Sequence, residues 1–215
     1  MIVIIDYSVG NLRSAQKGFE HAGVADVRVS GDREVIEAAD GLVLPGVGAY
    51  RDAIGRLRAT GLVETIEAKV AGGTPLLGIC LGMQLLVDKS YENGEWEGLG
   101  MIPGSCDAID PSLGVKVPHM GWNTVTYPRE SRLFDGIPGS SAFYFVHSYH
   151  CVPADSRDAI GTVHYGEQLV CAIERDNVFG VQFHPEKSSA LGLRLLSNFD
   201  RIVHDTPARD TPARG

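Results

Sequence analysis

Residues 75–87, PLLGICLGMQLLV, carry the pattern from which the architecture of this chain can be worked out. The apolar run Pro75–Ile79 predicts a buried strand, and Leu81–Val87 predicts a helix that follows at once. The turn between them, Gly78-Ile79-Cys80-Leu81-Gly82, places a nucleophilic residue type between two glycines. This spacing is typical of a nucleophile elbow, where small neighbours tolerate a strained backbone. The sequence therefore predicts an α/β fold with Cys80 at the carboxyl edge of a sheet.

The residues before this stretch alternate in the same way between strands and helices. Short apolar runs predict strands at Ile2–Ile5, Val27–Val29 and Leu42–Leu44. Helical spacing of apolar residues predicts helices over Leu12–Ala22 and Val35–Ala39, and helical structure from Ile54 up to Gly72-Gly73. Continuously apolar strands separated by helices indicate a mostly parallel sheet with helices on both faces.

The second half of the chain predicts an antiparallel extension of that sheet. Apolar runs separated by turns occur at Thr124–Tyr127, Ala142–Val146, Ala159–Val163, Val170–Ile173 and Val178–Phe183. Asp176 and Asn177 predict a hairpin turn between the last two runs, and a final helix is predicted over Ser189–Val203. We expect one domain over residues 1–203. Residues 204–215 repeat TPAR and are polar, so we expect a disordered tail there.

Composition narrows the class of protein. The 215 residues include 19 Lys and Arg against 27 Asp and Glu, a formal charge of −8, which argues against nucleic acid as a partner. No apolar run approaches the roughly 20 residues that span a bilayer, and acidic Asp6 follows the first run, so neither a membrane nor a secretory signal is expected. The four cysteines form no C-x-x-C pair, which favours free thiols and a cytoplasmic location.

Cys80 is the strongest candidate for a catalytic residue. The elbow would expose its sulfur at a helix N-terminus, where the dipole favours a thiolate, and would direct the Leu81 amide to a developing oxyanion. The alternative is a small buried cysteine in a tight turn. Cys106, Cys151 and Cys171 lack such a setting and are interpreted as inert strand or core residues.

His184 is the candidate base for this nucleophile. It follows an apolar strand, and His184-Pro185-Glu186 closes that strand, so the imidazole would lie at a strand end where Glu186 can fix its tautomer. A strand-terminal histidine that is only structural is the alternative. His147 and His150 are three residues apart near another strand end, but strand alternation would place them on opposite faces, so no metal site is expected.

Two further loops follow strands at the same expected edge. Leu44-Pro45-Gly46-Val47-Gly48 could supply a second oxyanion donor through a backbone amide, or be a plain strand–helix turn. Residues 8–11, SVGN, after the first strand are either an anion or partner site or only a helix cap.

Six motifs together resemble the class I (triad-type) glutamine amidotransferases over residues 1–203. The strings GICLGMQLL, GVQFHPEKSS and LPGVGAY carry the family resemblance. The strings DYSVGNLRS, VPHMGWNTV and FYFVHSYHC are similar to those of the glutaminase subunits of imidazole glycerol phosphate synthases. The resemblance implies a flavodoxin-like α/β fold and hydrolysis of glutamine through a cysteinyl thioester. It also implies that the ammonia passes to a cyclase partner in histidine biosynthesis.

The resemblance also implies roles for individual residues. Cys80 would be the nucleophile, His184 the base and Glu186 its orienting acid, with no cofactor. The oxyanion hole would be formed by Leu81 and the Gly46–Val47 peptide. Glutamine would be held by Gln84, Glu92 and the backbone of Ser148 and Tyr149. Residues that would face the ammonia exit or a (β/α)₈-barrel cyclase in a heterodimer are Asn11, His119, Met120, Trp122, Tyr144 and Lys187.

Three other functions stay open at this point. The chain could be the glutaminase subunit of an amidotransferase for pyridoxal phosphate or anthranilate synthesis. It could be a free-standing thiol hydrolase that uses the elbow on an ester, or a non-catalytic binding module with a buried cysteine. The flexibility that Gly46 and Gly48 give to Val47 also predicts that the isolated chain has low glutaminase activity.

Overall fold

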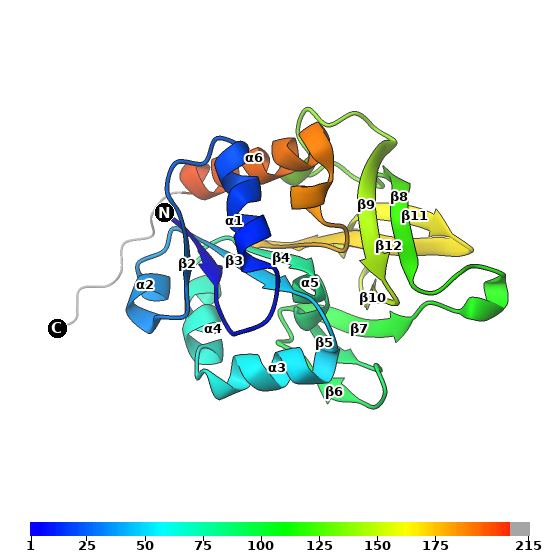
Figure 1. Cartoon of the computed structure of the whole chain (residues 1–215), viewed down its shortest axis with the longest axis horizontal. Coiled ribbons are helices and arrows are strands. Elements are labelled where there is room, and N and C mark those ends of the chain that lie inside the picture. Colours follow the sequence, from blue (N-terminus) through cyan, green and yellow to red (C-terminus); the bar gives the residue numbers. More distant parts are fainter. Residues whose placement is uncertain (207–215) are drawn as a thin grey trace.

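The computed structural model describes residues 1–206, which form one continuous mixed sheet flanked by helices (Figure 1). The main path of the sheet runs β2-β1-β3-β4-β13-β12-β10-β7-β5-β6, and β11, β8 and β9 branch from β12 as a curled antiparallel arm. The predicted α/β class with an antiparallel extension is therefore confirmed.

The parallel half of the sheet is built from five short strands. They are β2 (Val27–Ser30), β1 (Ile2–Ile5), β3 (Gly41–Gly46), β4 (Leu76–Cys80) and β13 (Val178–Val181). All four neighbouring pairs are parallel. Because parallel strands run the same way, their carboxyl ends meet at one edge, where Gly46 and Cys80 are direct neighbours.

Helices cover both faces of this half, as the uninterrupted apolar strands require (Figure 1). One face is covered by α1 (Leu12–His21) and α6 (Ser189–Asp205), and the other by α2 (Arg33–Glu37), α3 (Tyr50–Ala59) and α4 (Val63–Ala71). Strand alternation separates two cores. Ile2 and Ile4 belong to the core that contains α1 and α6, and Val3 and Ile5 belong to the other. No helix in residues 1–206 is long and apolar enough to cross a bilayer.

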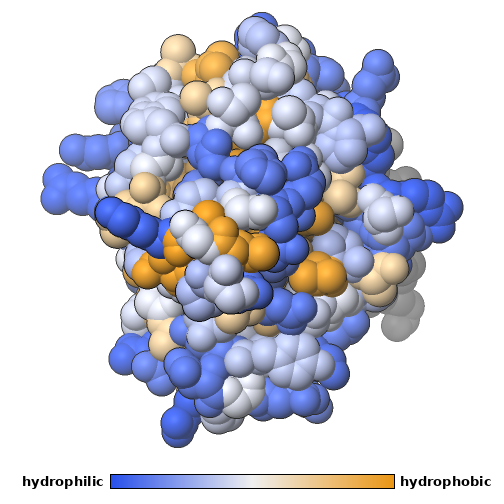
Figure 2. All heavy atoms as spheres, turned by 90° about the vertical axis from the view of Figure 1, so that its right-hand side faces the viewer, coloured by the Kyte–Doolittle hydropathy of each residue, from blue (hydrophilic) through white to orange (hydrophobic). Residues whose placement is uncertain are grey.

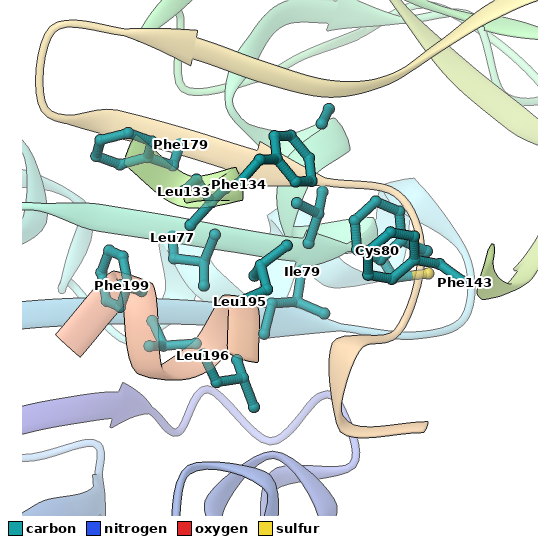
Figure 3. Close-up of a cluster of buried hydrophobic side chains, with 14 of the residues drawn as sticks. Leu77, Ile79, Cys80, Leu133, Phe134, Phe143, Phe179, Leu195, Leu196 and Phe199 are labelled. Atoms are coloured by element: carbon teal, nitrogen blue, oxygen red, sulfur yellow. The ribbon is translucent and has the colours of Figure 1, made fainter. Parts of the chain in front are cut away.

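Aromatic side chains join α6 to the sheet and to α1. Phe199 of α6 meets Phe19 of α1 and Phe179 of β13 edge-on, at centroid distances of 6.4 and 6.3 Å. Leu195 of the same helix lies beside Leu77 and Ile79 of the sheet (Figure 3), and Leu196 packs against α1, where a Cβ at Gly18 would lie 3.0 Å from its Cδ1. This contact fixes the last helix, and with it the segment that precedes it, against the parallel strands.

The remaining strands are antiparallel except where β5 pairs with β7. The main path continues through β12 (Glu167–Arg175), β10 (Tyr149–Pro153), β7 (Ile102–Ala108), β5 (Val87–Ser90) and β6 (Trp96–Glu97), and the arm contains β11 (Ala159–Tyr165), β8 (His119–Thr126) and β9 (Ser141–His147). Short helices are α5 (Leu81–Leu85), η1 (Pro111–Leu113), η2 (Arg132–Phe134), η3 (Ser156–Asp158) and η4 (Pro185–Lys187).

Several predicted boundaries were wrong. The helix after Cys80 ends at Leu85, and Val87 already belongs to β5. The strands over residues 87–108 escaped prediction because their sequences, VDKS, WE and IPGSCDA, are too polar or too interrupted to show alternation. The last helix continues to Asp205, two residues beyond its predicted end. The hairpin turn at Asp176 and Asn177 is confirmed, because Arg175 and Val178 are paired across it. The disorder expected for residues 204–215 was wrong for His204 and Asp205, which belong to α6, and residues 207–215 lie outside the described part.

The packing of α6 can be tested by shortening one buried leucine. Leu195 is fully buried in the core shared with Leu77, so Leu195→Ala should lower the free energy of unfolding by about 2–5 kcal/mol. Urea denaturation followed by circular dichroism measures this loss. Leu113→Ala is the matched control, because Leu113 is 43% exposed and its truncation should change stability by less than about 0.5 kcal/mol. Equal losses in the two variants would contradict the assigned core.

Candidate active site

The turn that carries Cys80 has a strained backbone held by close packing. Cys80 has φ 56° and ψ −113°, a backbone conformation that residues other than glycine rarely adopt. A Cβ at Gly78 would lie 2.7 Å from the Gly82 carbonyl oxygen, and one at Gly82 would collide with the Leu44 carbonyl oxygen. Both flanking positions must therefore be glycine, and the predicted elbow is confirmed in its backbone geometry.

The end of β3 packs directly against this elbow. A Cβ at Gly46 would lie 2.9 Å from both the Gly82 nitrogen and the Leu81 Cβ. The buried Tyr7 hydroxyl donates a 2.6 Å hydrogen bond to the Pro45 carbonyl and so fixes the chain just before the loop. Burial raises the pKa of Tyr7, which keeps this donor protonated. Beyond Gly46 the loop is open, because Val47 is 43% exposed and Gly48 has φ +93°.

His184 and Glu186 form a buried pair beside the elbow. The His184 amide donates to the Tyr144 carbonyl of β9 at 2.9 Å, which fixes the residue after β13 has ended. Glu186 lies on η4, and its Oε1 is 2.8 Å from His184 Nδ1. Helix α1 packs closely against Glu186, since a Cβ at Gly18 would lie 2.8 Å from the Glu186 Cβ. The Glu186 carboxylate therefore accepts the Nδ1 proton and leaves Nε2 as the reactive nitrogen.

The surroundings of His184 favour its protonated form. Burial acts to lower the pKa of the imidazole, but interactions with Cys80 and Glu186 outweigh it and raise the pKa to about 9. Within residues 1–206 no group is in hydrogen-bonding position to Nε2, which is buried. The imidazole thus faces the nucleophile with an unpaired nitrogen, ready to exchange a proton after a small adjustment.

Cys80 and His184 both line a cavity of about 280 Å³. The sulfur lies 4.0 Å from the Val146 carbonyl oxygen of β9 and 3.7 Å from Nε2 of Gln182. Two larger surface hollows, of about 730 and 760 Å³, lie elsewhere and contain neither residue. The smaller cavity is the candidate active site because the nucleophile and the base meet there.

The residues predicted to hold the substrate line the same cavity. They are Gln84, Glu92, Ser148 and Tyr149, together with Val47 and Leu81 from the predicted oxyanion hole. Glu92 is positioned by the Tyr50 amide, which donates to its Oε2 at 2.6 Å. The Tyr149 carbonyl already accepts hydrogen bonds from Gln84 Nε2 at 3.1 Å and His147 Nδ1 at 2.8 Å. A ligand would therefore meet the N–H groups or side chains of residues 148–149 rather than this carbonyl.

His119, predicted as an interface residue, is instead only 3% exposed. Its ring stacks between Phe145 and Tyr165, and its Nδ1 is 2.9 Å from Nε2 of His147. The pleat of β8 turns this side chain inward, while its neighbour Met120 points outward, so His119 does not lie on the surface and its assignment to the ammonia exit stays a prediction. Burial lowers the pKa of His119 to about 4 and that of His147 to about 3, so both rings are neutral at pH 7.

The other predicted interface residues are accessible. Met120 and Trp122 of β8 are 63% and 54% exposed, and Trp122 contacts the half-buried Tyr144 of β9 edge-on. Lys187 is exposed on η4, and Asn11 is exposed at the start of α1, where it caps the helix through Ser14. Figure 2 shows the face on the right-hand side of Figure 1, which is mostly hydrophilic and carries hydrophobic residues in small clusters. The assignment of these residues to an interface stays a prediction.

Two residues of the site were missed in the sequence. Ser188 donates to the His184 carbonyl at 2.6 Å and accepts from the Tyr144 amide at 3.0 Å, so it joins η4 to β9. Gln182 is fully buried although polar. It lies in the run VFGVQF, where a polar residue among apolar ones was the signal that could have identified it.

Comparisons with known proteins agree with this geometry. The family described as glutamine amidotransferase class-I matches residues 3–201. "Imidazole glycerol phosphate synthase subunit HisH" from Moorella thermoacetica is 50% identical over 202 residues, 94% of this chain and 95% of that protein. The protein of the same description from Aquifex aeolicus is 50% identical over 93% of this chain and 95% of its own length. Among solved structures, "Crystal structure of glutamine amidotransferase" aligns with a TM-score of 0.73 at 17% identity, over 94% of this chain and 98% of that chain.

The link between Glu186 and His184 can be tested through pH. Glu186→Gln removes the carboxylate that raises the His184 pKa, so an NMR titration of His184 should show a lower pKa than in the wild type. A raised pKa stabilises the fold fully below the ordinary value of 6.5, and this contribution is lost as pH rises through about 9. The stability difference between variant and wild type, from urea denaturation, should therefore be largest below pH 6.5 and shrink toward pH 9.

The matched control is Glu20→Gln on the exposed side of α1. This substitution should leave the pKa of His184 and the pH dependence of stability unchanged. A His184 pKa that stays in place without the Glu186 carboxylate would refute the pairing.

Proposed function

This chain belongs to the class I glutamine amidotransferases, and on that premise we propose that it is the glutaminase subunit of an imidazole glycerol phosphate synthase. The observation that carries the proposal is that Cys80 and His184 line one small cavity, with Glu186 bonded to the far nitrogen of His184. Relatives about 50% identical over most of their length support the choice of subfamily.

The first half of the reaction forms a thioester. His184 Nε2 takes the Cys80 proton, and the sulfur attacks the side-chain amide carbon of glutamine. The carbonyl oxygen becomes an oxyanion, which we assign to the Leu81 amide at the start of α5 and to the Gly46–Val47 peptide. As the C–N bond breaks, His184 returns its proton to the leaving nitrogen. Ammonia departs, and the γ-glutamyl group stays on the sulfur.

The second half releases glutamate. A water molecule gives a proton to His184 and attacks the thioester carbonyl, the C–S bond breaks, and the proton returns to Cys80. Glu186 holds the imidazole in one tautomer through both halves, because its carboxylate stays on Nδ1. One glutamine and one water are thus converted to glutamate and ammonia.

The cavity suits a small polar substrate. Its volume of about 280 Å³ is near the lower limit of ligand pockets, roughly 300 Å³. We assign Gln84 and Glu92 to the polar ends of glutamine. The Glu92 carboxylate supplies a counter-charge for the α-amino group, and Gln84, whose two Nε2 protons are donated to Tyr149 and Gln182, can offer its Oε1 as an acceptor. Ser148 and Tyr149 line the same wall. An ester or a larger amide without these charged ends would leave the charge of Glu92 without a counter-charge.

The ammonia requires a partner. In bulk water near neutral pH most of it would become ammonium, which is not a nucleophile, so it must be used before it escapes. We assign its transfer to a heterodimer with a (β/α)₈-barrel cyclase, which would dock near the exposed Met120, Trp122 and Lys187. Tyr144 and Asn11 would lie at the rim of this contact.

The first experiment distinguishes the release of ammonia from glutamine from the use of ammonia in synthesis. Cys80→Ala in the complex should abolish synthesis that depends on glutamine, at least about 10³-fold, but keep synthesis from added ammonium salts. Product formation is followed with each nitrogen source. Cys106→Ala tests a cysteine outside the cavity and should keep both activities. Loss of both activities on changing Cys80 would make that cysteine structural.

The second experiment identifies the partner. Because Val47 sits in an open loop after Gly46, we expect little glutamate release from the isolated chain and strong stimulation by the cyclase with its ligand bound. A coupled glutamate assay with each candidate acceptor subunit measures this. Stimulation only by the acceptor for pyridoxal phosphate or anthranilate synthesis would reassign the subfamily. Full activity without a partner would exclude a gated loop.

A further inference from the structure

Gln182 is a buried polar residue next to the nucleophile. Val181 of β13 is the register partner of Ile79 in β4, so the residues that follow each of them, Gln182 and Cys80, leave the sheet side by side. The Gln182 backbone is fixed because its amide donates to the Cys171 carbonyl at 2.8 Å. Its side chain has no exposed surface and lies with Nε2 3.7 Å from the Cys80 sulfur.

A chain of hydrogen bonds fixes which end of the Gln182 amide faces the sulfur. The Tyr149 carbonyl can only accept, so the Gln84 atom 3.1 Å from it is the nitrogen. That nitrogen also donates to Gln182 at 3.0 Å, so the Gln182 atom that it contacts is the oxygen. The remaining atom, Nε2, must then face Cys80 and can donate a proton to its sulfur.

We propose that Gln182 donates a hydrogen bond to the Cys80 sulfur, positions it for attack and stabilises its thiolate. This role rests on the proposed function, in which Cys80 is the nucleophile. A buried anion needs donors, and a hydrogen bond to a charged group is stronger than one to a neutral group. On its other side the sulfur meets the Val146 carbonyl at 4.0 Å, an acceptor that favours the thiol instead. Gln182 offsets this preference.

The same chain joins the sulfur to the substrate wall. Gln84 and Tyr149 line the cavity, and both are held in the network that ends at Gln182. A ligand that moved Gln84 would also change the hydrogen bond from Gln182 to the Cys80 sulfur. The titratable groups around Cys80 are Tyr7, His147 of β9, Glu92 across the cavity, and His184 with Glu186 after β13. Substitution of Gln182 removes none of these groups.

Two substitutions distinguish a Gln182 side chain that donates a hydrogen bond to the Cys80 sulfur from one that only packs against it. Gln182→Glu keeps an oxygen for Gln84 but replaces the donor at the sulfur with a carboxylate. Gln182→Met keeps the length and removes both polar atoms. In the complex with its partner, we measure the alkylation rate of Cys80 by iodoacetamide against pH, followed by mass spectrometry of the Cys80 peptide, and the kcat and KM for glutamine. Gln168→Glu, on the exposed part of β12, is the matched control.

We expect the pH midpoint of alkylation to rise by about one unit in Gln182→Met and further in Gln182→Glu, as loss of one charge-assisted bond predicts. At high pH the alkylation rates should return to the wild-type rate, and kcat at neutral pH should fall about 10-fold with KM changed less than about twofold. Gln168→Glu should match the wild type. High-pH recovery would not occur if Gln182 only packed against the sulfur.

An unchanged midpoint in both variants, or a rise in KM without a change in midpoint, would overturn the role of Gln182 and leave the proposed function intact. If instead Cys80→Ala kept its glutaminase activity, the proposed function itself would fail. If Gln182→Met does not fold, Gln182→Leu takes its place in the same measurement, because it also removes the donor without placing a new charge beside the sulfur.

Discussion

The close packing of two backbone segments, the Gly78–Gly82 turn and the end of β3, is the constraint on which the site depends. The Gly78–Gly82 turn fits only because its glycines touch the Leu44 carbonyl and their own chain without side chains between them. Gly46, on the neighbouring strand β3, packs against Leu81 and Gly82 and leaves no room for a side chain of its own. This packing holds Cys80 at a positive φ and directs its sulfur out of the sheet edge. The strain is sustained because two buried cores anchor the strands on either side.

The parallel pairing of β4 with β13 then brings the base to the nucleophile. The register Val181↔Ile79 sets residues 182–184 beside Cys80, although about a hundred positions separate them in sequence. The aromatic contacts of Phe199 fix α6, so the short η4 segment with Glu186 has one position over the sheet. Orientation of His184 by Glu186 and of the sulfur by Gln182 both follow from that single strand pairing.

The antiparallel arm gives the site its other wall. The edge of β9 that does not pair with β8 faces the catalytic segment, where its Tyr144 bonds to His184 and Ser188 and its Val146 carbonyl faces the sulfur. The outer surface of the same arm carries the exposed Met120 and Trp122. A contact on that surface would lie only one layer of chain away from the reacting groups, which gives a partner a short physical route to the nucleophile.

The alternation of apolar runs and helices and the glycine spacing around Cys80 determined the parallel half and the elbow, because both depend on local backbone requirements. The tripeptide His184-Pro185-Glu186 likewise predicted that His184 lies at a strand end, because proline terminates a strand. The inward turn of His119, the strands over residues 87–108 and the place of Gln182 were decided by tertiary structure alone. Each depends on which strand lies alongside and which face is covered. Register and packing between distant segments set these features. The sequence marked Gln182 only as a polar residue within an apolar run and did not show which group it would face.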